Sequence, residues 1–208
     1  MMIGWVGGWG ISPAELRPQA EAHAPHAQHV LLAPVPGAAE AAADCQAVVA
    51  WSFGAHRVLE AASRGVRFPN RVLLVGPFTS FCKEDGACGK ISRIQVQWLL
   101  RQLRQDPLAA LADFRVRAGL EASAVKDTLP YSQELLEEGL ARLAEPASAG
   151  LIAYARRGLP EGWEAYVGDK DPLLNADGVI AAIHGCVRVE GAGHRLSEFL
   201  VKEDGHAL

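Results

Sequence analysis

The sequence predicts an α/β fold, a doubly wound and mainly parallel sheet with helices on both faces. Three observations support this prediction. Short apolar runs alternate with helical stretches, the runs are rich in Val, Ile or Leu, and Gly or Pro follows most of them. Short runs of this kind are typical of strands buried on both faces of a parallel sheet. The six runs are Met2–Val6, Val30–Val35, Ala47–Trp51, Val72–Val75, Ala165–Val167 and Cys186–Val189.

The segments between the first runs predict helices. Ser12 is a candidate N-cap, because Pro13 stands at the first helical position and Glu15 three residues after the cap, as in a capping box. Ala38–Ala43 and Phe53–Ala62 are two further candidates. Repeated strand–helix–strand units connect parallel strands by right-handed crossovers, so this alternation favours a doubly wound sheet.

Residues 78–157 interrupt the alternation with a long, mainly helical insertion. We expect this insertion to form a helical cap over one end of the sheet, and residues 1–77 and 158–208 to form the core. A second independent domain is less favoured, because the flanks lack the composition of a flexible linker. The apolar residues at helical spacing are Ile94, Trp98 and Leu99, then Leu108, Leu111 and Phe114, and then Leu135, Leu136, Leu140 and Leu143.

Composition and charge exclude several classes of protein. Lys and Arg total 20 against 24 Asp and Glu, a net charge of −4, so the chain lacks the basic balance of a nonspecific nucleic-acid binder. Half of the residues are apolar, which argues against disorder. No apolar run reaches the roughly 18 residues that span a bilayer, and no basic stretch precedes the apolar N-terminus as in a secretory signal. Four cysteines do not make a disulfide scaffold. We expect a cytoplasmic protein with no membrane or nucleic-acid partner.

The sharpest local motif is the pentapeptide at residues 50–54, Ala-Trp-Ser-Phe-Gly. It follows a predicted strand and precedes a predicted helix, which is the context of a nucleophile elbow. The residues two before and two after the serine must be small, and Ala50 and Gly54 meet this requirement. The alternative is an incidental Ser-x-Gly turn. We favour Ser52 as a catalytic nucleophile.

A serine nucleophile needs a base and an acid that orients the base. In this fold context the chain order is Ser, then Asp or Glu, then His. His194 follows the sixth predicted strand, and Asp169 and Asp171 both follow the fifth. These are carboxyl ends of strands, where doubly wound sheets place their sites. We favour Asp171 as the acid, because the preceding loop can turn before its carboxylate meets the histidine.

Two backbone N–H groups are candidates for an oxyanion hole. One belongs to Phe53, the residue after the nucleophile, and the other to Trp9 in the glycine-rich loop after the first strand. Glycines in that loop allow a close approach of the backbone to a substrate. We expect the side chains of Trp9 and Trp51 to line the substrate pocket.

The remaining histidines favour structural roles. His23, His26 and His29 are three apart, but Pro25 interrupts them, so surface positions are favoured over a metal site. His56 lies on the helix after the elbow and is expected to pack or cap. We predict no metal site and no organic cofactor.

With these motifs in place, the chain resembles the α/β-hydrolases, and within them the pimeloyl-acyl-carrier-protein methyl ester esterases of biotin synthesis. The resemblance covers nearly the whole chain. The matching segments are residues 8–10 (oxyanion loop), 50–54 (elbow), 76–86 (entry to the cap), 102–114 and 135–143 (cap helices), 168–171 (acid loop) and 193–194 (base).

The chain also departs from the family pattern. It starts at the oxyanion strand, without the two strands that usually precede it, so we expect six core strands in the spatial order 2-1-3-4-5-6. Gly8 replaces a histidine of the oxyanion loop. Ala109 and Asp113 stand where the family has cap arginines that contact the carrier protein, and Arg115 and Arg117 are the nearby candidates for that role.

The resemblance implies a serine carboxylester hydrolase that cleaves the methyl ester of pimeloyl-acyl-carrier protein. The triad motifs are shared by many hydrolases, so a general short-acyl esterase or thioesterase acting on small free substrates is the alternative. A lyase that uses the same pocket and a binding protein on an inactive scaffold are further alternatives. The intact Ser, Asp and His in this order disfavour the inactive scaffold.

Overall fold

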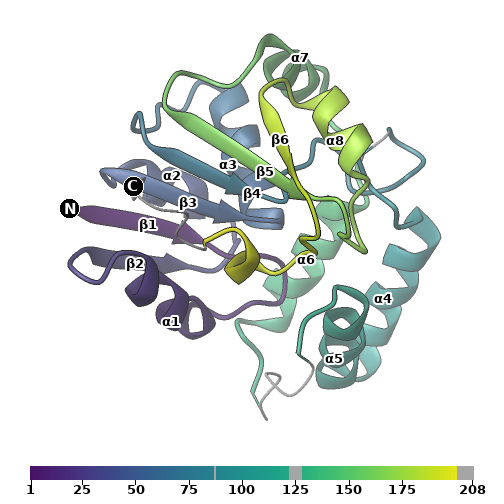
Figure 1. Ribbon diagram of the computed structural model, residues 1–208. Helices are drawn as coiled ribbons and strands as arrows, with labels where there is room; N and C mark the ends of the chain where they lie inside the picture. Colours follow the sequence, from purple (N-terminus) through teal and green to yellow (C-terminus); the bar gives the residue numbers. More distant parts are fainter. Residues whose placement is uncertain (87, 122–127, 201–208) are drawn as a thin grey trace.

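The computed structural model describes residues 1–86, 88–121 and 128–200. Within these ranges six strands form one sheet, every neighbouring pair is parallel, and the order is β2-β1-β3-β4-β5-β6 (Figure 1). The predicted fold class, strand number and strand order are confirmed. The strands are β1 (Met2–Val6), β2 (Gln28–Leu32), β3 (Ala47–Trp51), β4 (Val72–Val75), β5 (Trp163–Gly168) and β6 (Cys186–Val189).

Two predicted strand ranges were wrong at their ends. β2 begins at Gln28 and ends at Leu32, earlier than the apolar run at residues 30–35. This strand is at the edge of the sheet and pairs only with β1 there, so a polar start is tolerated. β5 begins two residues before the expected start, because Trp163 and Glu164 continue the pairing with β4. Glu164 is exposed, which broke the apolar pattern in the sequence.

The central strands of the sheet are buried on both faces, which explains their continuous apolar runs. In β3, Val48 and Ala50 pack into one hydrophobic cluster, and Val49 and Trp51 into another. Successive side chains of a strand point to opposite faces. The second cluster includes Leu16 from α1, whereas α2 and α3 contribute to the first. The helices are α1 (Pro13–His23), α2 (Ala38–Ala43), α3 (Phe53–Ser63), α4 (Arg93–Gln105), α5 (Pro107–Arg117), α6 (Gln133–Leu143), α7 (Ala149–Arg157) and α8 (Ala176–Ala182), with the 3₁₀ helix η2 (Leu196–Glu198).

The ends of the first helices follow from their sequences. α1 starts at Pro13 after the N-cap Ser12, and the Ser12 N–H donates to Glu15 Oε1 at 2.9 Å, as the capping-box pattern predicted. α2 has the predicted bounds, and α3 extends one residue past the predicted end.

The insertion between β4 and β5 contains α4, α5, α6 and α7. Helices α4 and α5 lie beyond the carboxyl ends of the strands, and α6 passes between them and the sheet (Figure 1). Helix α4 contacts both α5 and α6, whereas α7 contacts α3 and α8. The expected cap, residues 78–157, therefore includes α7, a helix that packs on the core. The cap proper consists of α4, α5 and α6.

Candidate active site

The elbow holds Ser52 in an unusual backbone conformation between β3 and α3. Its φ of 56° and ψ of −117° make it the one non-glycine residue with positive φ in the part of the chain that is described. The Ser52 N–H donates to the Val75 carbonyl at 2.7 Å, which fixes the turn against β4. A Cβ atom at Gly54 would lie 2.4 Å from the Val6 carbonyl oxygen, so this position requires glycine. Strain of this kind is stored at functional sites.

Three buried side chains form a hydrogen-bonded chain at the elbow. His194 Nε2 lies 2.9 Å from Ser52 Oγ, and His194 Nδ1 lies 2.6 Å from Asp171 Oδ2. The other carboxylate oxygen, Asp171 Oδ1, accepts the backbone N–H groups of Leu173 and Leu174 at 2.8 and 3.0 Å. The sequence named Ser52, Asp171 and His194 as one site, and the structure brings them together. Hydrogen bonds of this geometry let a histidine take a serine proton while the carboxylate holds the imidazole tautomer.

Asp169, the competing aspartate, has a different environment. Its Oδ1 accepts the Gly191 N–H at 2.7 Å, and its Oδ2 lies 3.6 Å from Lys170 Nζ. These contacts connect the loops after β5 and β6. The carboxylate that contacts His194 is that of Asp171.

Neighbouring groups support the histidine and the aspartate from several elements. The Trp51 indole N–H donates to the His194 carbonyl at 2.9 Å. The Gly193 N–H donates to Glu198 Oε2 at 2.6 Å, which connects the histidine loop to η2. Lys90, which lies between β4 and α4, donates from Nζ to the Asp171 carbonyl at 2.6 Å. Sequence analysis missed Lys90, since no local pattern connects residues so far apart in the chain.

The two candidate oxyanion donors are available for a ligand. Among the described residues, neither the Trp9 N–H nor the Phe53 N–H donates to a protein acceptor. Phe53 is the first residue of α3, whose N-terminal N–H groups have no acceptor in the helix. Gly8 is adjacent to the nucleophile: a Cβ atom there would lie 3.4 Å from Ser52 Cβ. The glycine-rich loop and the start of α3 therefore flank the serine.

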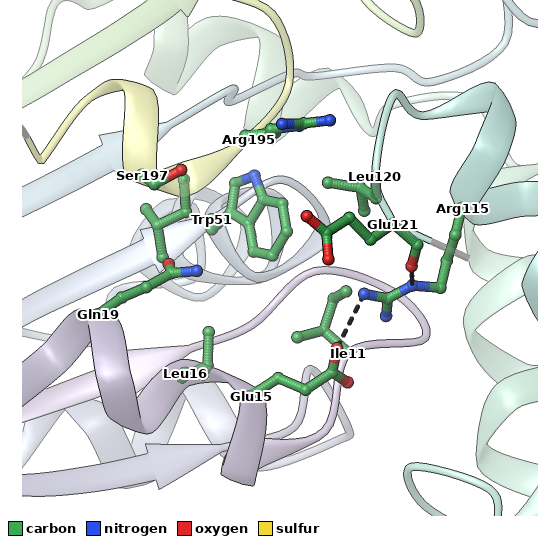
Figure 2. Close-up of a pocket in the computed structure, with 11 residues that line it drawn as sticks. Ile11, Glu15, Leu16, Gln19, Trp51, Arg115, Leu120, Glu121, Arg195 and Ser197 are labelled. Atoms are coloured by element: carbon green, nitrogen blue, oxygen red, sulfur yellow. Dashed lines mark hydrogen bonds and ion pairs between the residues drawn. The ribbon is translucent and has the colours of Figure 1, made fainter. Parts of the chain in front are cut away.

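Figure 2 shows a cavity of about 250 Å³ whose lining includes the chain neighbours of Ser52 and His194 but neither residue itself. These neighbours are Trp51, which precedes the serine, and Arg195, which follows the histidine. Its walls are both apolar and charged, and include an ion pair between Arg115 and Glu15 (2.9 Å). The lining residues are Ile11, Glu15, Leu16, Gln19, Trp51, Arg115, Leu120, Glu121, Arg195, Leu196 and Ser197.

The two tryptophans differ in their relation to this cavity. Trp51 lines this cavity, whereas neither Ser52 nor His194 is among the lining residues. Trp9 does not line it, and its side chain is buried: the indole N–H donates to the Leu136 carbonyl at 2.9 Å, and the ring packs edge-on against Phe114. The expectation that the Trp9 indole faces the pocket was wrong, because α5 and α6 of the cap cover it.

The two arginines proposed as carrier contacts also differ. Arg115 is only 6% exposed, and besides its ion pair with Glu15 it donates from Nε to the Glu121 carbonyl. A buried, paired guanidinium does not suit contact with a partner protein, so this expectation is corrected for Arg115. Arg117 is exposed and borders a second, narrow cavity of about 30 Å³ between α4, α5 and α6.

The remaining histidine and cysteine candidates do not join the proposed site. His56 is buried between the rings of Phe53 and Phe78, as predicted for a packing residue. Within the described ranges, no three His, Cys, Asp or Glu side chains group so as to hold a metal ion, and all four cysteines are free and buried. No helix in these ranges is both long and apolar enough to cross a bilayer.

Comparison with solved structures identifies the fold. An esterase (EaEST) from Exiguobacterium antarcticum matches 96% of this chain and 87% of its own, with a TM-score of 0.73 and 14% identity. The 2-hydroxy-6-oxo-6-phenylhexa-2,4-dienoate hydrolase of Rhodococcus sp. strain RHA1 matches 93% and 83%, with a TM-score of 0.60 and 15% identity. BioG from Haemophilus influenzae matches 95% and 90%, with a TM-score of 0.57 and 15% identity.

At the level of sequence, no protein-family model and no curated protein matches the chain. The structural likeness extends over almost the whole chain, and the sheet order and the elbow between β3 and α3 agree with it. The chain therefore has the α/β-hydrolase fold, as the resemblance in its sequence predicted.

Proposed function

We propose that the protein is a serine carboxylester hydrolase. The observation that carries this proposal is the hydrogen-bonded chain from Ser52 Oγ through His194 to Asp171, at a strained elbow. Structures named as an esterase and as a hydrolase share the fold and support the same reaction class.

The geometry supports a two-step acyl transfer. Ser52 Oγ attacks the ester carbonyl carbon while His194 Nε2 takes the hydroxyl proton. The carbonyl oxygen becomes an oxyanion that accepts the N–H groups of Trp9 and Phe53, and each such donor is worth about 3 kcal/mol in related sites. The tetrahedral intermediate collapses, His194 protonates the departing alkoxide, and an alcohol leaves. Water, deprotonated by His194, then attacks the acyl-serine and releases the acid.

The proposed substrate is the methyl ester of pimeloyl-acyl-carrier protein, with methanol as the leaving alcohol. The sequence resemblance in the elbow, the cap and the acid loop supports this choice. Exposed side chains on the cap support a partner: Ile94, Trp98 and Val116 are 75%, 50% and 64% exposed, and the exposed Arg117 follows Val116 in the chain. An apolar surface with basic residues suits an acidic carrier protein.

A second candidate is a general short-acyl esterase or thioesterase. It is favoured by the burial of Arg115 and by Ala109 and Asp113, which stand at positions where the resembled family has carrier-binding arginines. This enzyme would act on small free esters.

A mass-spectrometric assay distinguishes these candidates. Pimeloyl-carrier methyl ester and free dimethyl pimelate are incubated with wild-type protein, with Ser52→Ala as the blank. We expect cleavage of the carrier-bound ester, at least about tenfold faster than that of the free ester. Preference for the free ester would support the second candidate. Turnover by Ser52→Ala at the wild-type rate would refute the serine mechanism.

A further inference from the structure

The glycine-rich loop after β1 is held by the cap through two hydrogen bonds. The Gly10 N–H donates to Tyr131 Oη at 2.9 Å, and the Trp9 indole N–H donates to the Leu136 carbonyl at 2.9 Å. Tyr131 precedes α6, and Leu136 belongs to it. Both acceptors are more than a hundred residues from the loop in the sequence, so only the folded cap supplies them.

The packing around this loop leaves little room for movement. A Cβ atom at Gly139 of α6 would lie 2.7 Å from Trp9 Cδ1, so the indole lies directly on the helix backbone. The ring of Phe114 from α5 meets the indole edge-on, with centroids 4.8 Å apart. Gly10 has a φ of +72°, and a Cβ atom there would approach Leu111 of α5 to 2.8 Å. The loop is therefore clamped between the sheet and the cap.

The hydroxyl of Tyr131 holds the peptide next to the proposed oxyanion donor. The N–H of Trp9 belongs to one peptide plane, and the N–H of Gly10 belongs to the following plane. Fixing the second plane and the indole restricts both backbone angles of Trp9, and so the direction of its N–H. Gly10 is buried, so without the hydroxyl its N–H would lose its acceptor, and the loop would shift to find another.

The surroundings of Tyr131 keep the hydroxyl neutral. Burial raises the pKa of this phenol well above its ordinary value, and the bond from Gly10 opposes the rise only in part. The nearby Arg57 forms an ion pair with Glu138 of α6 at 2.5 Å, which adds a further tie between α3 and the cap. The oxygen therefore remains a neutral acceptor across the range in which hydrolases work.

We propose that Tyr131 is a positioning residue for the oxyanion hole: it aims the Trp9 N–H at the substrate carbonyl by holding Gly10. This inference rests on the proposed function of the site. It goes beyond that function because it makes the cap part of the catalytic geometry rather than only a cover over the substrate.

The test compares Tyr131→Phe with the wild type, with p-nitrophenyl butyrate as the substrate and an aryl trifluoromethyl ketone as the inhibitor. The ketone forms a tetrahedral adduct with the serine and so reports on the oxyanion hole. Removal of a whole donor costs about 10²–10³ in kcat elsewhere, and a donor that is only misaligned should cost less. We expect kcat to fall about tenfold, the inhibition constant to rise by the same factor, and KM to stay within about twofold.

The matched control is Tyr154→Phe. Tyr154 is a partly buried tyrosine of α7 whose hydroxyl makes no hydrogen bond within the described ranges. This variant should keep both kcat and the inhibition constant within about twofold of the wild type. Amide hydrogen exchange adds a measurement that needs no variant: in the wild-type protein the Gly10 amide should be protected about as well as the amides of β1.

Two results would overturn the inference. One is a Tyr131→Phe variant that unfolds at a lower temperature but keeps kcat and the inhibition constant, which would leave the tyrosine a purely structural role. The other is fast exchange of the Gly10 amide in the wild type. Neither result resembles failure of the proposed function, which would appear as activity that survives Ser52→Ala.

Discussion

Acidification should destabilise the protein through His56, a residue outside the proposed reaction. Its imidazole is stacked between Phe53 and Phe78, with centroids 6.0 and 5.0 Å away, and Nδ1 donates to the Phe78 carbonyl at 3.0 Å. Burial lowers the pKa of His56 from 6.5 to about 4, the Phe78 carbonyl opposes this shift, and the charge of Arg142 reinforces it.

The sign and the size of the effect follow from proton linkage. Between pH 6.5 and pH 4 the unfolded chain binds a proton at His56 and the folded chain does not, so stability rises with pH through this window and is lost as the pH falls. The lowered pKa corresponds to about 3 kcal/mol when the whole window has been crossed. Between pH 7 and pH 5 the expected loss is about 2 kcal/mol.

Urea unfolding of the wild type and of His56→Asn at several pH values measures the contribution of His56 to the free energy of unfolding. The asparagine amide keeps a donor for the Phe78 carbonyl but does not titrate. The free energy of unfolding of the wild type should fall by about 2 kcal/mol more than that of the variant between pH 7 and pH 5. Parallel pH profiles of the two proteins would refute the assignment of the buried neutral imidazole.

Three further substitutions test the elbow and the acid loop. Gly54→Ala would place a Cβ atom 2.4 Å from the Val6 carbonyl oxygen. It should therefore reduce the free energy of unfolding, measured by urea titration, by about 1–3 kcal/mol and also lower kcat. An unchanged unfolding midpoint would contradict this prediction. Asp171→Asn should lower kcat by about 10⁴, since the amide favours the wrong tautomer of His194, while Asp169→Asn should stay within about twofold. Equal losses in the two variants would mean that the assignment of the acid is wrong.

Most of the fold could be predicted from the sequence because the signals were local. Strands β3 and β4 are buried on both sides, so the unbroken apolar runs Ala47–Trp51 and Val72–Val75 predicted their bounds correctly. The edge strand β2 was misplaced, since an exposed edge needs no apolar residue at its start. The apolar stripe of α7 does not reveal that its partners are α3 and α8.

In the candidate site, too, features carried by neighbouring residues could be predicted from the sequence, whereas contacts between residues far apart in the chain could not. The elbow at Ser52 requires small neighbours and a sharp turn, and both are visible in five consecutive residues. The contacts of Tyr131 and Lys90 connect positions more than eighty residues apart, so no spacing in the sequence reveals them. The burial of Arg115 depends on Glu15 of α1, which an arginine pattern on one helix could not indicate.

The most direct test of the account is to identify the residue that becomes covalently modified. A fluorophosphonate probe reacts with a serine only when a base has activated its hydroxyl. Intact-mass and peptide mass spectrometry should show one adduct, on Ser52, formed by the wild type and absent from Ser52→Ala and His194→Ala. Labelling of a different residue, or equal labelling of the His194→Ala variant, would contradict the claim that these side chains form a serine hydrolase site.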